Sequence, residues 1–113
     1  MFEILKIDKV ARGRLYSLKV GKSEIKILIT FHALERTKVW SLKDEHILSA
    51  ILCPEEVLIG HRDRFIAHRR KGKHIIRAVY EYDKMLPVVI TVYYPYIERY
   101  FKGGKTFADK ILP

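Results

Sequence analysis

Apolar and polar residues alternate along the first 30 positions of the chain, which predicts β-strands. The segments 14–20 (RLYSLKV) and 24–30 (EIKILIT) place apolar side chains at every second position, as on one face of a strand. The loop GKS between them contains a glycine, so these two strands are predicted to form a hairpin. The first ten residues, MFEILKIDKV, are a candidate further strand.

The spacing of apolar residues then changes to that of helices. Residues 30–38 fit a short helix with Thr30 as its N-cap. Residues 42–53 carry a stripe of apolar side chains at helical spacing. Ser41, with an aspartate three residues later, resembles a capping box before this second helix, and Pro54 ends it.

The remaining segments are rich in β-branched and aromatic residues and are separated by turn signals, which predicts four strands: 56–60, 64–69, 73–83 and 87–95. This order predicts an α+β fold. The two helices of the N-terminal half would pack on one face of a curled, mainly antiparallel sheet and leave the opposite face open.

The length of 113 residues suits a single domain, 1–113. Residues 1–29 form its N-terminal strands and residues 30–95 its core. Residues 96–113 are a basic, aromatic tail, predicted to be either a short helix or a flexible arm.

The net charge of +9 favours a polyanionic partner such as nucleic acid, an acidic protein or an anionic membrane face. The segment 61–77 alone holds seven Lys or Arg residues against Asp63. A lysine-rich thermophile surface would explain the charge but not its clustering. The candidate nucleic-acid-binding residues are Arg62, Arg64, Arg69, Arg70, Lys71, Lys73 and Arg99.

Other compositional features concern the environment of the protein. The chain contains no asparagine and no glutamine, which is typical of hyperthermophile proteins. Cys53 is the single cysteine, and the sequence has neither a signal-peptide pattern nor an apolar run long enough for a membrane helix. We therefore expect a soluble, cytoplasmic protein with no membrane partner.

Two polar residues stand out in the first predicted helix. His32 and Arg36 lie one turn apart on one helix face, within an otherwise apolar run. Structural roles are the alternative: a helix-start position for His32, and an ion pair with Glu35 or Asp44 for Arg36.

A third candidate lies within a predicted strand. Strand alternation would place Arg77 on the open face of the sheet with Thr91 and Tyr93, whereas Val88, Ile90 and Val92 would face the helices. A structural pair of Arg77 with Glu81 or Glu98 is the alternative. We predict that His32, Arg36, Arg77 and Tyr93 form one catalytic site.

Motifs for metals and cofactors are missing from the sequence. The five histidines lack the i, i+4 spacing of a helical zinc site, and Cys53 has no cysteine partner. The sequence contains no P-loop, dinucleotide fingerprint or nucleophile elbow. We expect neither a metal nor a cofactor, which leaves His, Arg, Lys and Tyr for any chemistry.

Several segments together resemble a known family: FHALER at a helix start, then LCPEEVLIG, RFIAHR, KHIIRAVYE and VVITVYYP. This pattern resembles a family of small bacterial and archaeal domains of unknown function with a His-Ala-x-x-Arg helix. That family is similar to the BrnT-like branch of the RelE/ParE toxin superfamily. The likeness covers about Thr30 to Pro95, the RelE-like core, and includes His32, Arg36 and Arg77.

This resemblance implies a toxin of a toxin–antitoxin system. RelE-like toxins are metal-independent ribonucleases or ribosome-associated mRNA cleavers that use a basic concave sheet face and pair with an acidic or DNA-binding antitoxin. ParE-like members instead poison a topoisomerase. The chain departs from the family pattern after Trp40, because only Lys38 stands where many members have a longer helix with a second arginine.

RNA cleavage by a 2′-hydroxyl requires a base, an acid and stabilisation of the charged phosphorane. His32 would be base or acid, because imidazoles titrate near neutrality. Arg36 and Arg77 would hold the phosphate, and Tyr93 would stack on a base or assist proton transfer. The alternatives are a non-catalytic nucleic-acid-binding module and an interaction protein with an acidic protein partner.

Overall fold

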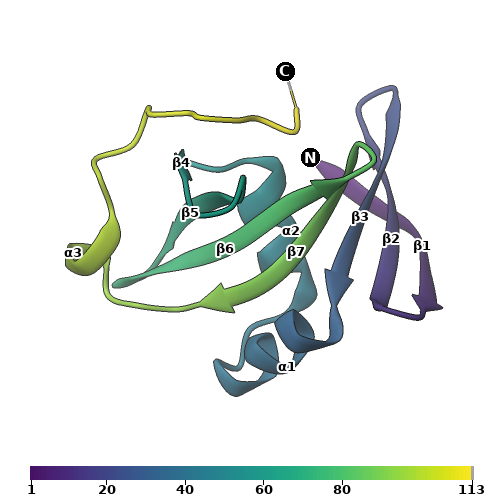
Figure 1. The fold of residues 1–113 in the computed structure, drawn as a ribbon, viewed down its shortest axis with the longest axis horizontal. Coiled ribbons are helices and arrows are strands. Elements are labelled where there is room, and N and C mark those ends of the chain that lie inside the picture. Colours follow the sequence, from purple (N-terminus) through teal and green to yellow (C-terminus); the bar gives the residue numbers. More distant parts are fainter. Residues whose placement is uncertain (113) are drawn as a thin grey trace.

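Seven strands and three helices follow one another in the computed structural model, which describes residues 1–112 (Figure 1). Pro113, the last residue of the predicted tail, lies outside the described residues. The elements are β1 (Phe2–Val10), β2 (Gly13–Val20), β3 (Ser23–Thr30), α1 (Phe31–Val39), α2 (Asp44–Leu52), β4 (Glu56–Ile59), β5 (Phe65–Lys71), β6 (His74–Asp83), β7 (Leu86–Tyr93) and α3 (Ile97–Tyr100).

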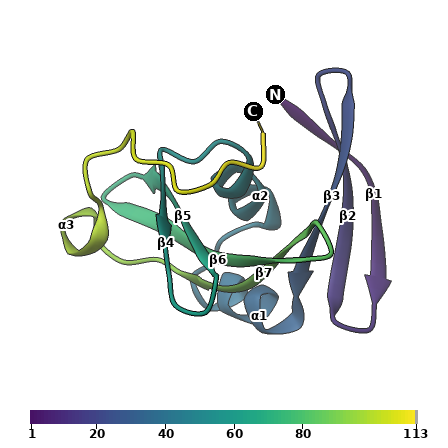
Figure 2. The same cartoon turned by 45° about the horizontal axis from the view of Figure 1, so that its top comes forward.

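All seven strands belong to one sheet, in the order β1-β2-β3-β7-β6-β5-β4. Neighbouring strands are antiparallel except for β3 and β7, which are parallel and pair Leu28 with Val88. The meander β1–β3 therefore continues the same sheet as β4–β7, and β7 joins the two parts (Figure 2). The α+β class and the mainly antiparallel sheet agree with the sequence-based prediction.

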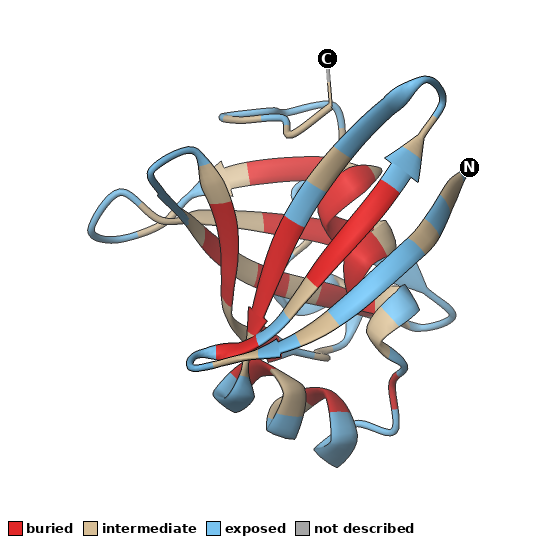
Figure 3. Ribbon diagram, turned by 90° about the vertical axis from the view of Figure 1, so that its right-hand side faces the viewer, coloured by how far each residue is buried: buried red, intermediate tan, exposed pale blue. Residues whose placement is uncertain are grey.

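Two helices bury their apolar sides against the sheet, and α1 packs mainly on β7 whereas α2 packs on β5 and β6. Figure 3 shows the buried positions along the middle of the strands and on one side of α2. The core includes Tyr16, Leu18, Ile27, Ile29, Ile47, Ile51, Ile76, Ala78, Val89 and Val92. No helix in the described part of the chain is long and apolar enough to cross a membrane.

Of the two predicted helix starts, the first is correct and the second is wrong. Thr30 caps α1, and its side-chain oxygen accepts a hydrogen bond from the backbone N–H of Ala33 at 3.2 Å. The predicted Ser41 capping box is wrong, because α2 begins at Asp44 and Ser41 lies in the preceding turn with a positive φ of 56°. At the observed start of α2, the ring nitrogen Nδ1 of His46 accepts a hydrogen bond from the backbone N–H of Lys43 at 3.1 Å.

A β-bulge in β7 changes which of its residues face the core. Thr91 pairs with Val79, but the next pair along the ladder is Val89 with Tyr80, so Ile90 is an extra residue. The predicted helix-facing set Val88, Ile90 and Val92 is therefore partly wrong, because Val89 joins Val92 in the core instead. Beyond the bulge, Thr91 and Tyr93 keep the predicted open face.

The C-terminal tail begins with a single helical turn, α3, so the helices are not confined to the N-terminal half. After α3 the tail runs along β4, the edge strand of the sheet (Figure 1). Val57 donates its N–H to the carbonyl of Thr106 at 2.7 Å and accepts from the N–H of Ala108 at 2.8 Å. The tail is thus not a free arm, because its backbone satisfies groups that the edge strand would otherwise expose.

Candidate nucleic-acid interface

The open face of β5–β7 contains a hollow of about 650 Å³. Arg77, Thr91 and Tyr93 all line it, which agrees with the prediction that they share one face. The loop between β4 and β5 closes one side of the hollow and adds three polar residues, His61, Arg62 and Arg64. His61 had been missed by sequence reasoning, because a histidine in a loop has no periodicity that would assign it to a face.

Arg77 is held in place by its strand neighbour His68. The two residues pair across β5 and β6, and Nη1 of Arg77 donates to Nε2 of His68 at 2.9 Å. The guanidinium also lies over the ring of Tyr100, with Cζ 4.2 Å from its centre. Among the described residues, Arg77 forms no ion pair with Glu81 or Glu98, which were the predicted structural alternatives, and Glu81 accepts from Arg64 at 3.2 Å.

Behind Arg77 lies a fully buried charged group, the carboxylate of Glu56. Nδ1 of His68 and Oε2 of Glu56 are 2.6 Å apart, and both side chains are inaccessible to solvent. The carboxylate also accepts from the backbone N–H groups of Lys102 at 2.9 Å and Gly104 at 3.0 Å. These two N–H groups of the tail, which follow α3, thus help to stabilise a charge that would be costly to bury alone.

The hydrogen bonds fix the tautomer of His68. A guanidinium can only donate, so Nε2 of His68 must accept from Arg77, and the ring proton lies on Nδ1 and is donated to Glu56. Burial lowers the pKa of His68, and although the bond to Glu56 acts in the opposite direction, the positive charge of Arg77 adds to the decrease. His68 is therefore a neutral link between an anion and a cation.

The charges of Glu56 and Arg77, the two residues that His68 connects, follow from the same contacts. Burial alone would raise the pKa of Glu56, but the bonds from His68, Lys102 and Gly104 outweigh it and lower that pKa. Burial lowers the pKa of Arg77, whose ordinary value is so high that the guanidinium stays charged. The result is a charged arginine that is held by His68 and lines the hollow.

His32 reaches the same face from α1. Its Nε2 lies 3.1 Å from Oγ1 of Thr91, which is two residues from Tyr93 on β7. Tyr93 in turn is the strand partner of Arg77. The structure therefore brings His32, Tyr93 and Arg77 to one side of the sheet, with Thr91 between the helix and the other two.

Arg36 is not among the residues that line this hollow. Its guanidinium carbon is 5.4 Å from the ring centre of Trp40, and it forms no ion pair with Glu35 or Asp44 among the described residues. Asp44 instead accepts from the hydroxyl of Tyr16 at 2.9 Å.

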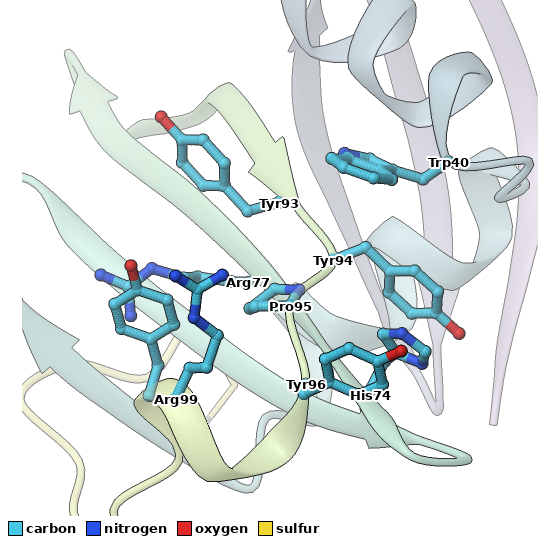
Figure 4. Close-up of a pocket in the computed structure, with 9 residues that line it drawn as sticks. Trp40, His74, Arg77, Tyr93, Tyr94, Pro95, Tyr96 and Arg99 are labelled. Carbon is cyan, nitrogen blue, oxygen red and sulfur yellow. The ribbon is translucent and has the colours of Figure 1, made fainter.

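A second hollow of about 600 Å³ adjoins the first and shares Arg77 and Tyr93 with it. Its other lining residues are Trp40, His74, Tyr94, Pro95, Tyr96, Arg99 and Tyr100 (Figure 4). Sequence reasoning named only Arg99 among these. The density of aromatic residues in YYPYIERYF was the available signal, but it could not say on which face the rings would gather.

The predicted basic residues divide into three groups. Arg62, Arg64 and Arg99 line one of the two hollows. Arg69 donates to the carbonyl of Cys53 at 2.8 Å, and Arg70 pairs with Glu55 at 2.7 Å, so both make structural contacts. The remaining two, Lys71 and Lys73, are exposed at the β5–β6 turn.

The combined face offers a fixed guanidinium, imidazoles from α1 and the β4–β5 loop, and several exposed aromatic rings. These groups suit a ligand that carries both phosphates and planar rings. Within residues 1–112, no group of three or more His, Cys, Asp or Glu side chains is placed to hold a metal ion. Comparison with protein-family models, with curated proteins and with solved structures gave no match to this chain.

Proposed function

We propose that this chain is a toxin-like RNA-binding protein that cleaves RNA by attack of a 2′-hydroxyl on the adjacent phosphate. The observation that carries the proposal is the chain Glu56–His68–Arg77, which fixes a cation on a face shared with Tyr93 and the His32–Thr91 pair. Preorganised charge of this kind stabilises the phosphorane without reorganisation during the reaction.

The proposed reaction transfers one proton at each end. The 2′-oxygen forms a bond to phosphorus and loses its proton to one imidazole, while the bond from phosphorus to the 5′-oxygen breaks and that oxygen takes a proton from the other imidazole. His32 is the proposed base and His61 the proposed acid. Arg77 would bind the nonbridging oxygens, and the products would be a 2′,3′-cyclic phosphate and a 5′-hydroxyl.

The strong positive charge supports two further parts of the proposal. RNA would bind through its phosphates at Arg62, Arg64 and Arg99, which line the hollows. Such phosphate contacts do not read the base sequence. The net charge of +9 also favours an acidic antitoxin as partner. The RelE/ParE-like assignment belongs to this proposal and rests on the sequence resemblance.

A non-catalytic RNA-binding module is the second candidate. It is favoured by the exposure of His32, whose ring forms a hydrogen bond with Thr91 alone among residues 1–112. In that case loss of His32 would leave every function intact, whereas loss of Arg77 would weaken binding.

Cleavage of end-labelled RNA by the purified protein tests the first candidate. We expect cleavage that persists in EDTA and stops when the attacking nucleotide is replaced by its 2′-deoxy form. His32→Ala and Arg77→Ala should each lower the rate about 100-fold or more, the scale for losing one acid–base or charge-stabilising group.

Two substitutions outside the face serve as matched controls. His46 lies at the start of α2, and Arg12 pairs with Asp83 on the surface, so His46→Ala and Arg12→Ala should cleave at the parental rate. RNA that binds but is never cut would favour the non-catalytic candidate. Equal losses of cleavage rate in the variants of the open face and in the control variants would contradict the roles assigned to His32 and Arg77.

A further inference from the structure

The second hollow has one aromatic wall that is already ordered. The ring of His74 is stacked between Tyr94 and Tyr96, with both ring-centre distances at 4.5 Å and interplanar angles of 15° and 25°. His74 and Tyr96 also form an isolated β-bridge. A wall fixed in this way loses little side-chain entropy when a ligand packs against it.

Trp40 stands apart from this wall, at the end of α1, and Figure 4 shows the hollow between Trp40 and the two arginines, Arg77 and Arg99. Both arginines lie beside Tyr100, at 4.2 and 6.0 Å from its ring centre. One side of the hollow is thus aromatic and the other is cationic.

Several of these rings are unusually exposed. Trp40 is 37% exposed, Tyr93 45%, Tyr96 56% and Tyr100 39%. Exposed large apolar side chains that gather on one surface mark binding sites, and a volume of about 600 Å³ is within the range of small-molecule sites. An apolar peptide would leave the arginines unpaired, whereas a nucleotide offers a ring and a phosphate together.

We infer that this hollow binds one unpaired nucleobase of the RNA, adjacent to the phosphate held by Arg77. The inference rests on the proposed RNA-binding function and adds a base subsite to it. Unpaired bases stack readily on aromatic side chains, and Arg77 and Tyr93 belong to both hollows. A base in this position would hold the neighbouring phosphate over the open face of the sheet.

Trp40 is the only tryptophan in the sequence, so its fluorescence reports on this hollow. The test compares a short single-stranded oligonucleotide with uncleavable 2′-O-methyl sugars and an abasic oligonucleotide with the same number of phosphates. We expect the first to quench Trp40 and to bind roughly 5- to 150-fold more tightly than the second, the effect of stacking one base.

Substitutions identify the residues responsible, with affinity measured by anisotropy of the labelled oligonucleotide and folding checked by circular dichroism. Trp40→Ala and Tyr96→Ala should weaken binding of the base-bearing oligonucleotide and leave the abasic one unchanged. Trp40→Phe retains a ring and should restore most of the affinity. Phe107→Ala removes an aromatic side chain from the tail, outside the hollow, and should have no effect.

The outcomes separate this inference from the proposed function. Equal affinity for both oligonucleotides with unchanged fluorescence would overturn the base subsite and leave RNA binding intact. Binding of neither would overturn both. A nucleoside monophosphate that binds as tightly as the oligonucleotide would replace RNA by a free nucleotide as the ligand.

Discussion

Replacement of Glu56 by alanine should destabilise the fold far more than the same change at the adjacent Glu55. Glu56 is fully buried and accepts hydrogen bonds from three N–H donors: those of His68, Lys102 and Gly104. Glu55 directly precedes β4 and is partly exposed, and its carboxylate accepts from the backbone N–H and the side chain of the exposed Arg70. The two glutamates thus have the same chemistry at neighbouring positions and differ in burial.

The size of the effect follows from the donors left unpaired. The Nδ1–H of His68 has no access to water and should cost about 1–3 kcal/mol when its acceptor is removed. The two backbone N–H groups lie nearer the surface and should add about 1 kcal/mol together, since water can partly replace the carboxylate. The total of about 2–4 kcal/mol overlaps the roughly 3–5 kcal/mol for breaking a buried charged pair.

Urea unfolding followed by circular dichroism measures this loss directly, with Glu55→Ala as the matched control. The expected decrease in the free energy of unfolding for Glu56→Ala corresponds to a fall in the melting temperature of about 10–20 °C for a domain of this size. The Glu55 variant should lose much less, because its ion pair is exposed and screened. Similar losses in the two variants would refute the conclusion that the Glu56 carboxylate organises this region.

Three further predictions concern pH, salt and temperature. In the folded state the pKa of His68 is lowered from 6.5, so the unfolded chain binds more protons below that pH. The free energy of unfolding should therefore fall as the pH decreases from about 6.5. His68→Gln, which keeps a donor and an acceptor, should flatten this part of a curve of stability against pH. RNA affinity should fall with salt with a log–log slope of roughly −3, since four arginines line the two hollows and each released counterion contributes about −0.7 on a single strand; a flat plot would exclude phosphate binding there. The absence of asparagine and glutamine predicts a melting temperature above about 80 °C by calorimetry, and a transition near 50 °C would contradict the hyperthermophile interpretation.

Local patterns were sufficient to predict most of the fold. The alternation in segments 14–20 and 24–30 corresponds to the hairpin of β2 and β3, and the four later strands lie where β-branched residues cluster. The bulge at Ile90 could not be predicted, because β7 pairs not only with β6, its neighbour in sequence, but also with β3, which is distant in sequence and whose pairing no local pattern shows. For the same reason, no local pattern indicated that the tail would cover β4.

The candidate site was predictable only where one side chain was unusual for its element. Arg77 stood out as a charge within an apolar strand, and His32 as a histidine at the start of a helix. Glu56 and His68 gave no such signal, because the second of two glutamates after a proline and a histidine in a basic segment both resemble surface residues. Their burial arises from the approach of the tail, which brings Lys102 and Gly104 to the carboxylate.

The central place of β7 in the sheet has a consequence for synthesis and truncation. The last strand to be made is the one that joins β3 to β6, and it also supplies Thr91 and Tyr93 to the open face. A chain that stops before Leu86 would leave two half-sheets, each with an unpaired edge able to associate with other chains. Products that end before β7 should therefore aggregate, and the open face can form only after β7 has been translated.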